Sequence, residues 1–312
     1  MLDEALKEYA ELEKYDETRL DAMVKTGLIH FEKKNYDEAV KKFREVLALR
    51  PELHRVRYYL AASYEERGEM EAAAKEFSLI PENDQGFIDS KIHLAYIYER
   101  QGRLKDTIRE LKDALRIKGD NVEIIKLLAS IYRENKMYAE AVEAMKDAVR
   151  MKPDDAEVLF TLGMLYDDAR EEALAMDAMQ KVLVLDPGHA NALNYIGYTF
   201  AEKGIRLDEA EAYIKKALEI RPESGHILDS LGWVYYKKGN FDRAVAELEK
   251  AIKYLPKDPI VMEHLGDAYW KRSSKDKALI SYETAAALDP GNSEIKNKIE
   301  KLKEEIKARK AR

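Results

Sequence analysis

The sequence predicts an all-α fold made of tandem helical hairpins, and three observations support this. Small residues recur along most of the chain with a period of roughly 34 residues. The 312 residues include only 8 Pro and 14 Gly, while Ala, Leu, Glu and Lys dominate, which favours helix over a turn-rich β fold. Prolines recur near the end of most periods, where they would end a helix.

The period itself predicts a pair of packed helices. The small residues follow one another at a constant interval, except for one interval that is longer by a single position: Gly27, Ala61, Ala95, Ala129, Gly163, Gly197, Gly232 and Gly266. A ring follows three positions after each of them, and a bulky apolar residue comes later in each period, from Phe43 to Tyr282. Small residues allow two helices to approach closely, and the rings and bulky residues fill the space around that contact.

Eight repeats follow from this register. They span residues 20–53, 54–87, 88–121, 122–155, 156–189, 190–224, 225–258 and 259–292. In the seventh repeat, apolar residues fall at helical spacing over 228–235 and again over 244–252, and Gly239-Asn240 supplies the turn between them. Each repeat is therefore expected to contain a first and a second helix.

The N-terminal segment, residues 1–19, is expected to be the second helix of an incomplete repeat. Ala5, Tyr9 and Leu12 stand in the register of a second helix. We expect the chain to be a fragment of a longer array, because an end hairpin normally keeps both helices to shield its neighbour. The half-repeat would leave an apolar face open, which makes self-association through this end an alternative function.

The C-terminal segment, residues 293–312, is expected to be a capping helix. Ile295, Ile299, Leu302 and Ile306 form one apolar stripe on a strongly charged helix. A single stripe of this kind suits a helix that covers the last repeat on one face and meets water on the other.

The spacing of the small residue, Tyr, Ala, bulky residue and Pro closely resembles the tetratricopeptide repeat over residues 20–292. The resemblance implies a right-handed superhelical solenoid of stacked helix-turn-helix hairpins, with the first helices lining a concave groove. Lys34, Lys136, Arg170 and Ser273 stand where the family usually has the turn Gly, which leaves the geometry of these turns open.

The sequence offers no catalytic, cofactor or metal motif. There is no Cys, and no nucleotide-binding, nucleophile-elbow or metalloprotease motif. The histidines, which are His30, His54, His93, His189, His226 and His264, never fall three or four positions apart, so no helix face presents a ligand pair. We therefore predict a protein that is not an enzyme and binds no cofactor and no metal.

Charge and hydropathy narrow the class of partner. The net charge is -7, and the first-helix positions expected to face the groove carry seven basic and fifteen acidic residues. This balance disfavours nucleic acid and favours a neutral or basic peptide, although solubility alone would also account for the acidic residues. No apolar run is long enough to span a membrane.

A cluster in the sixth to eighth repeats is the predicted site for a peptide or partner protein. It combines both tryptophans of the chain with Tyr, Asn, Asp and His: Asn191, Asn194, Tyr195, Tyr198, His226, Asp229, Trp233, Tyr236, His264, Asp267 and Trp270. Trp and Tyr are enriched at binding hot spots, and Asn and Asp can hydrogen-bond an extended backbone. The alternative is that some rings pack between adjacent hairpins. A weaker second patch comprises Tyr58, Tyr59, Tyr96 and Phe160.

Residues 190–270 also resemble bacterial cell-envelope repeat proteins, among which are adaptors for a periplasmic protease. That resemblance implies a bacterial adaptor in the periplasm or cell envelope, with the cytoplasm as the alternative. The family's two-carboxylate clamp for chaperone C-termini is absent, since Ser130 and Thr161 replace its asparagines. The predicted function is a non-catalytic scaffold. The alternatives are a self-assembling solenoid and a docking fragment of a larger enzyme.

Overall fold

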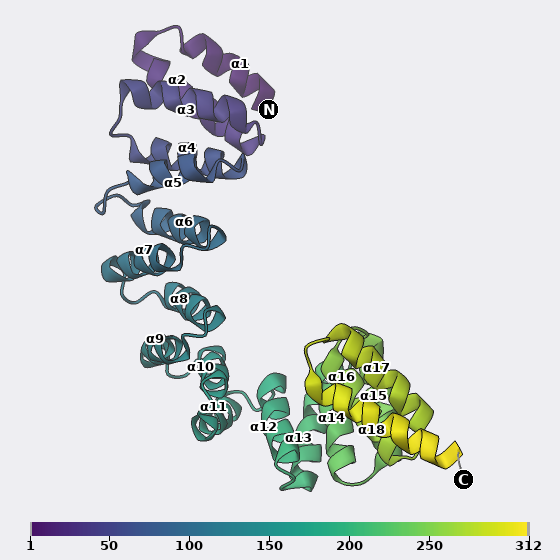
Figure 1. The fold of residues 1–312 in the computed structure, drawn as a ribbon. Coiled ribbons are helices and arrows are strands. Elements are labelled where there is room, and N and C mark those ends of the chain that lie inside the picture. Colours follow the sequence, from purple (N-terminus) through teal and green to yellow (C-terminus); the bar gives the residue numbers. More distant parts are fainter. Residues whose placement is uncertain (1, 311–312) are drawn as a thin grey trace. The chain divides into compact units, whose positions relative to one another are not determined.

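A computed structural model describes residues 2–310, and in this range it contains eighteen α-helices and no strand (Figure 1). The predicted all-α architecture is thus confirmed. Met1 and residues 311–312, which belong to the two predicted end segments, lie outside the described residues. The chain divides into two compact units, residues 1–151 (unit 1) and 152–312 (unit 2).

Unit 1 contains nine of these helices. They are α1 (Leu2–Leu12), α2 (Asp16–Glu32), α3 (Tyr36–Leu49), α4 (His54–Glu66), α5 (Met70–Ser78), α6 (Phe87–Arg100), α7 (Leu104–Ile117), α8 (Val122–Glu134) and α9 (Tyr138–Met151). Unit 2 contains α10 (Ala156–Asp168), α11 (Glu172–Leu185), α12 (Ala190–Glu202), α13 (Leu207–Ile220), α14 (Gly225–Lys237), α15 (Phe241–Tyr254), α16 (Pro259–Lys271), α17 (Lys275–Leu288) and α18 (Ser293–Lys310). From α2 to α17, consecutive helices pack as hairpins, α2 with α3 through α16 with α17.

The small and bulky residues of the period meet inside each hairpin. In α16, a Cβ added to Gly266 would lie 2.5 Å from the ring of Tyr282, which is wholly buried on α17. Close packing of this kind leaves no room for a side chain, so the small residue is needed where the partner is a ring. The same pairing recurs between Gly27 and Phe43 in the first hairpin.

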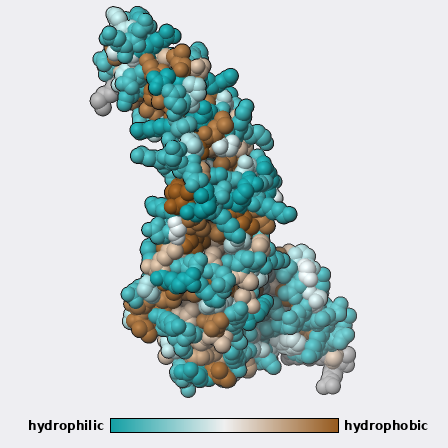
Figure 2. Space-filling view, turned by 90° about the vertical axis from the view of Figure 1, so that its left-hand side faces the viewer, coloured by the Kyte–Doolittle hydropathy of each residue, from teal (hydrophilic) through white to brown (hydrophobic). Residues whose placement is uncertain are grey.

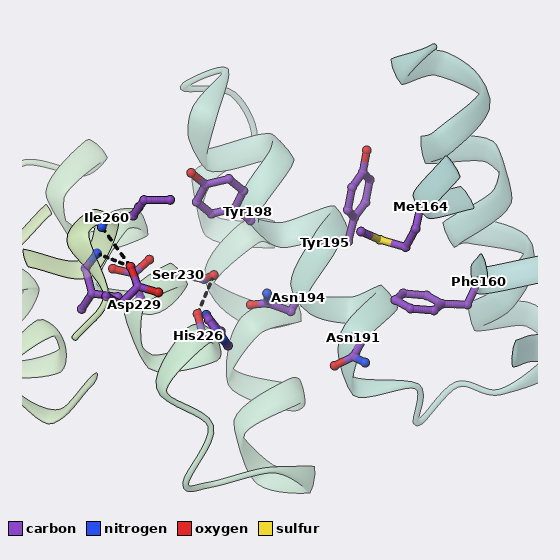
Figure 3. Close-up of a pocket in the computed structure, with 12 residues that line it drawn as sticks. Phe160, Met164, Asn191, Asn194, Tyr195, Tyr198, His226, Asp229, Ser230 and Ile260 are labelled. Carbon is purple, nitrogen blue, oxygen red and sulfur yellow. Dashed lines mark hydrogen bonds between the residues drawn. The ribbon is translucent and has the colours of Figure 1, made fainter. Parts of the chain in front are cut away.

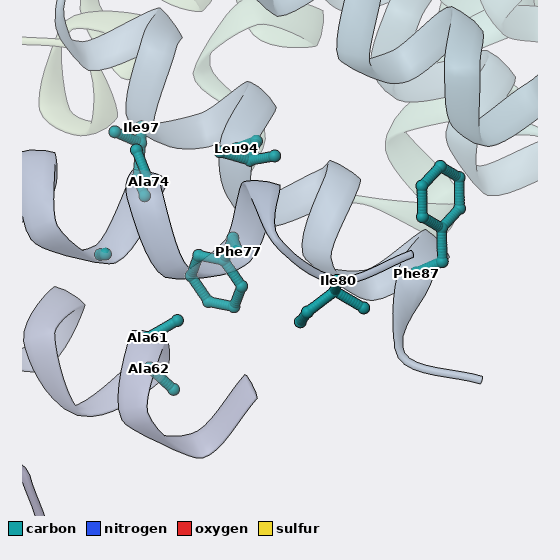
Figure 4. Packing of buried hydrophobic residues seen from close by; sticks show 9 residues of the cluster. Ala61, Ala62, Ala74, Phe77, Ile80, Phe87, Leu94 and Ile97 are labelled. Carbon is teal, nitrogen blue, oxygen red and sulfur yellow. The ribbon is translucent and has the colours of Figure 1, made fainter. Parts of the chain in front are cut away.

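Neighbouring hairpins complete each other's core. Phe77 of α5 is fully buried next to Ala61 and Ala62 of α4 (Figure 4). Leu94 and Ile97 of α6, in the next hairpin, belong to the same apolar cluster. A hairpin cannot bury both apolar faces alone, so stacking supplies the missing cover.

The second residue after the first helix has positive φ in every hairpin, whether or not it is Gly, and the longer turn of the sixth hairpin has a further such residue, Arg206. Lys34, Lys136, Arg170 and Ser273 have φ angles of 59°, 59°, 64° and 65°, in the left-handed region. Gly68, Gly102, Gly204 and Gly239 also have positive φ. The departures from the repeat pattern therefore preserve the turn, at a cost of roughly 1–2 kcal/mol for each residue with a Cβ.

Two helices differ in length from the other helices of the repeats. Helix α2 begins at Asp16, before the predicted repeat boundary at residue 20. Helix α5 ends at Ser78 and is shorter than the other second helices, because Pro81 follows and cannot continue a helix. Ile80 is nevertheless 3% exposed, so the chain still contributes to the core after the helix has ended.

The two end helices differ in how much they bury. Helix α1 packs on α2 but contributes no buried residue, whereas α18 packs on α17 and buries Ile295 and Leu302. Figure 2 shows brown hydrophobic patches among the teal hydrophilic surface on one face of the molecule. None of the helices in residues 2–310 is long and apolar enough to cross a membrane.

Candidate functional site

A pocket of about 400 Å³ opens on unit 2, between the first helices of four successive hairpins (Figure 3). Helices α10, α12 and α14 and the start of α16 line it with Phe160, Met164, Asn191, Asn194, Tyr195, Tyr198, His226, Asp229, Ser230, Asp258, Ile260 and Val261. Six of the eleven residues in the predicted site are among them: Asn191, Asn194, Tyr195, Tyr198, His226 and Asp229.

Helix α12 supplies four of these side chains because of its periodicity. Asn191, Asn194, Tyr195 and Tyr198 are spaced as i, i+3, i+4 and i+7, which places them on one face of a helix. The opposite side of α12 buries Leu193 and Ile196 in the stack. The rotation of the helix is therefore fixed by its apolar side, and the polar side is left to line the pocket.

Asn194 lines the pocket and has one unsatisfied polar atom. Its Oδ1 is inaccessible to solvent and has no hydrogen-bond partner among the described residues. In Figure 3 the Asn194 side chain lies between Phe160 on one side and His226 on the other. Buried polar atoms normally have partners, and an asparagine amide can both donate and accept. Because Oδ1 is covered by protein atoms, the Asn194 amide has to rotate before a ligand can bond to this oxygen.

Carboxylates dominate the charge around the pocket. Asp229 and Asp258 line it, and no Lys or Arg does. Asp258 also caps α16, since its Oδ1 accepts hydrogen bonds from the backbone N–H groups of Ile260 and Val261 at 2.9 and 3.2 Å. A lining of this sign attracts neutral or cationic groups rather than anions.

The two tyrosines of α12 both have raised pKa values, and Tyr195 donates a hydrogen bond to a carboxylate. Burial and a 2.7 Å hydrogen bond from the Tyr195 hydroxyl to Asp167 raise the pKa of Tyr195 above its usual value. Burial also raises the pKa of Tyr198, and the charges of Glu202 and Asp229 add to this effect. Both phenols therefore keep their protons at neutral pH and cannot add negative charge to the pocket.

Asp229 contacts the first ring of an aromatic stack formed by His264, Trp233 and Tyr236. Its carboxylate lies 2.9 Å from Nδ1 of His264, and both residues are buried. The His264 ring stacks on Trp233 with centroids 4.2 Å apart, and Trp233 stacks on Tyr236 at 4.7 Å. Burial lowers the pKa of His264, but the hydrogen bond and charge of Asp229 outweigh this and raise it. The contact with Asp229 therefore favours the protonated form of the His264 ring.

Five residues of the predicted site do not line the pocket: Trp233, Tyr236, His264, Asp267 and Trp270. Trp233 and His264 are each only 9% exposed. The indole N–H of Trp233 donates to Glu202, and that of Trp270 donates to Glu305 of α18 at 3.2 Å. Asp267 accepts hydrogen bonds from Tyr282 and Lys298. These five side chains pack between hairpins and against α18 instead of facing the pocket.

The remaining lining residues were not in the predicted site. Phe160 belonged to the weaker second patch, and Ile260, Met164, Ser230, Asp258 and Val261 were in neither set. The sequence contains a signal that could have placed two of them in the site, because Phe160 and Ile260 stand in the same register positions as Asn194 and Asn191, respectively. Of the other members of the second patch, Tyr59 packs against Phe31 and Phe43, and Tyr58 packs against Tyr59, Phe77 and His93.

Profiles of the tetratricopeptide repeat family match most of the chain. One matches residues 2–54, 160–225 and 230–293, and a second matches residues 30–96 and 98–159. The chain belongs to the tetratricopeptide repeat family. The resemblance inferred from the period of the sequence is confirmed. Proteins with this repeat are generally scaffolds for protein interactions and generally lack catalytic activity. In the described residues, no group of three His, Asp or Glu is arranged to hold a metal ion.

Individual relatives are similar over shorter stretches or in fold alone. A repeat-containing protein of Pseudomonas aeruginosa is 44% identical over 46 residues, which are 15% of this chain and 8% of that protein. A tetratricopeptide repeat protein from Parabacteroides merdae is 19% identical with a TM-score of 0.61, covering 80% of this chain and 98% of that structure. PilW, a type IV pilus biogenesis factor, is 22% identical with a TM-score of 0.57, and the match covers 69% of this chain and 99% of that structure. These structures share the fold.

Proposed function

We propose that this tetratricopeptide repeat protein is a non-catalytic scaffold that binds an extended segment of a partner protein in the pocket of unit 2. The single observation that carries the proposal is the pocket itself, where side chains from four successive first helices meet and where the lining residue Asn194 has an amide oxygen with no hydrogen-bond partner among the described residues. An extended backbone offers a free N–H and a free C=O at each residue, which match the two functions of a side-chain amide.

The lining also limits which segment fits. Phe160, Met164 and Ile260 offer apolar contact area, and Ile260 is 59% exposed. Asp258 supplies negative charge and no Lys or Arg belongs to the lining, whereas Asp229 is paired with His264 behind it. A neutral or basic segment with at least one apolar side chain satisfies both features, because apolar contact supplies affinity and opposite charge supplies selectivity.

Replacing Asn194 with alanine is expected to weaken partner binding by about 1–2 kcal/mol, about tenfold in affinity, because the partner's backbone groups lose their hydrogen bonds. Partners would be captured from a bacterial lysate on the immobilised chain and identified, and the affinity of a synthetic peptide from the bound region would then be measured by calorimetry.

Asn297→Ala is the matched control, because Asn297 is exposed on α18 and does not line the pocket. Equal affinity of the Asn194→Ala and Asn297→Ala variants for the peptide would contradict the proposed site. Raising the salt concentration should also weaken the binding of a basic peptide, since the carboxylates of the pocket are screened.

Self-association through α1 is a second candidate function. Leu2, Leu12 and Tyr15 are 42%, 39% and 64% exposed, and α1 buries no residue of its own. Replacing Leu12 and Tyr15 with serine is expected to weaken self-association by about tenfold in sedimentation velocity, because apolar contact area is lost. Leu49→Ser is the control at another exposed apolar residue of the same unit. A wild-type chain that remains monomeric at high concentration would exclude this candidate.

A further inference from the structure

Helix α11 exposes apolar side chains on the face that points away from the stack. Leu174, Val184 and Leu185 are 45%, 79% and 40% exposed. The other side of the helix packs on α10 and α12 and buries four residues: Ala175, Ala178, Met179 and Val182. Exposed apolar residues scattered singly are common on proteins, but several on one helix face indicate a surface that contacts another molecule.

Four exposed residues of this face have the spacing of a contact line between two helices. They follow one another by three, four and three positions: Leu174, Asp177, Lys181 and Val184. Residues at this spacing form the seam of a coiled coil. Within one chain, Nζ of Lys181 lies 2.8 Å from the Asp177 carboxylate, and these two side chains are 62% and 57% exposed. The ion pair is therefore open to a second molecule.

The order of the four residues is symmetric. From either end, the seam presents an apolar residue, two residues of opposite charge and a second apolar residue. In an antiparallel pair of α11 helices, Leu174 of one copy meets Val184 of the other, and Asp177 meets Lys181. A two-fold axis repeats both contacts, so apolar groups pair with apolar groups and each carboxylate pairs with an ammonium group.

The neighbouring second helices do not have this property. At the two end positions of the seam, α13 has Glu209 and Glu219, and α15 has Arg243 and Lys253. Two antiparallel copies of either helix would bring like charges together at both ends, which is unfavourable. The seam of α11 is thus complementary to itself, whereas the corresponding seams of α13 and α15 are not.

We propose that two copies of this chain associate through their α11 helices, antiparallel and related by a two-fold axis. The dimer goes beyond the proposed scaffold function and does not rest on it, because α11 contributes no residue to the pocket of unit 2. It also differs from self-association through α1, which lies in unit 1.

The size of the contact sets its strength. A groove of about 420 Å³ beside α11, lined in part by Leu183, Pro187 and Tyr213, adds apolar surface next to the seam. One pair of short helices nevertheless buries less than the ~1,200 Å² typical of stable complexes. We therefore expect a reversible dimer with a dissociation constant of about 0.1 mM.

Cysteine cross-linking of the full chain tests the antiparallel register directly, because the sequence contains no cysteine. An equimolar mixture of the Leu174→Cys and Val184→Cys variants at about 0.2 mM should form a disulfide-linked dimer on mild oxidation. Either variant alone should give at least about tenfold less, because two equivalent positions would lie ~15 Å apart along the seam, too far for a disulfide.

A mixture of Arg243→Cys and Lys253→Cys variants is the matched control, since these residues hold the same seam positions in α15. This mixture should remain monomeric. Replacing Leu12 and Tyr15 with serine in the α11 cysteine variants should leave their cross-linking unchanged, which separates this dimer from association through α1.

Charge exchange tests the centre of the seam. Asp177→Lys alone places four ammonium groups at the two-fold axis, and Lys181→Asp alone places four carboxylates there. Each variant should self-associate at least about tenfold more weakly than the wild type in sedimentation velocity. A mixture of the two should associate again, because each copy then meets the opposite charge. Circular dichroism of each variant verifies the helical fold.

Three outcomes would overturn the proposal. They are a wild-type chain that stays monomeric up to about 1 mM, equal cross-linking of the cysteine mixture and the single variants, and a mixture of the charge variants that associates no better than either alone. None of them bears on partner binding in the pocket of unit 2, where Asn194→Ala is the test. The two proposals can therefore fail separately.

Discussion

Replacing Trp233 with alanine is expected to lower the free energy of unfolding of unit 2 by about 3 kcal/mol. The indole is only 9% exposed, lies between the rings of His264 and Tyr236, and donates its N–H to Glu202. Truncation would remove buried apolar area and leave a cavity between α14 and α16, whereas the exposed Glu202 carboxylate would be hydrated by water. Urea unfolding followed by circular dichroism would measure the change.

Trp270→Ala is the control for this prediction, because Trp270 is half-buried and packs near the chain end against α18. Trp270→Ala should lower the free energy of unfolding clearly less than Trp233→Ala does. Equal stabilities of the wild type and the Trp233→Ala variant would show that Trp233 is a surface ring, free to contact a partner, and the stacked arrangement in unit 2 would then be wrong.

Replacing Asp229 with asparagine is expected to destabilise unit 2 by about 3 kcal/mol at acidic pH, because it leaves the buried imidazolium of His264 without its counter-charge. The pH dependence should change as well. The folded-state pKa of His264 is raised above its usual 6.5, so the folded chain binds the proton more tightly than the unfolded chain. The pair's contribution is complete below pH 6.5 and is lost as the pH rises through the folded-state pKa.

The measurement is the unfolding free energy of both proteins at several values between about pH 5 and pH 9. The difference in unfolding free energy between the wild type and the Asp229→Asn variant should decrease as the pH rises. His226→Gln is a suitable control, since His226 is exposed on the same helix. A gap that stays constant with pH would mean that His264 does not carry the proton in the folded chain.

The period of the sequence made the helices and their pairing predictable. Gly266 and Tyr282 could be assigned to one contact because both lie within one hairpin, where the helical repeat and a short turn fix their relative positions. The same holds for Asn191, Asn194, Tyr195 and Tyr198, which share one face of α12 by spacing alone. Lys34 and Arg170 show that the turn itself tolerates residues other than Gly.

Exposure along the first helices could not be predicted in the same way. Met164, Tyr198 and Trp233 occupy one register position in three successive repeats. Met164 and Tyr198 line the pocket, whereas Trp233 is buried under the ring of His264. The difference depends on the size of the side chain that packs against this position from the following hairpin. That side chain belongs to another repeat, so the residue's own repeat does not reveal it.

The sequence by itself determined the helices, their pairing and the faces that each pair must bury, because these depend on contacts within a single period. Only the tertiary structure decided that Trp233 and His264 are buried in one part of the predicted site while Asn194 lines a pocket in another. The physical reason is that close packing between hairpins depends on the combined volumes of residues that lie in different repeats.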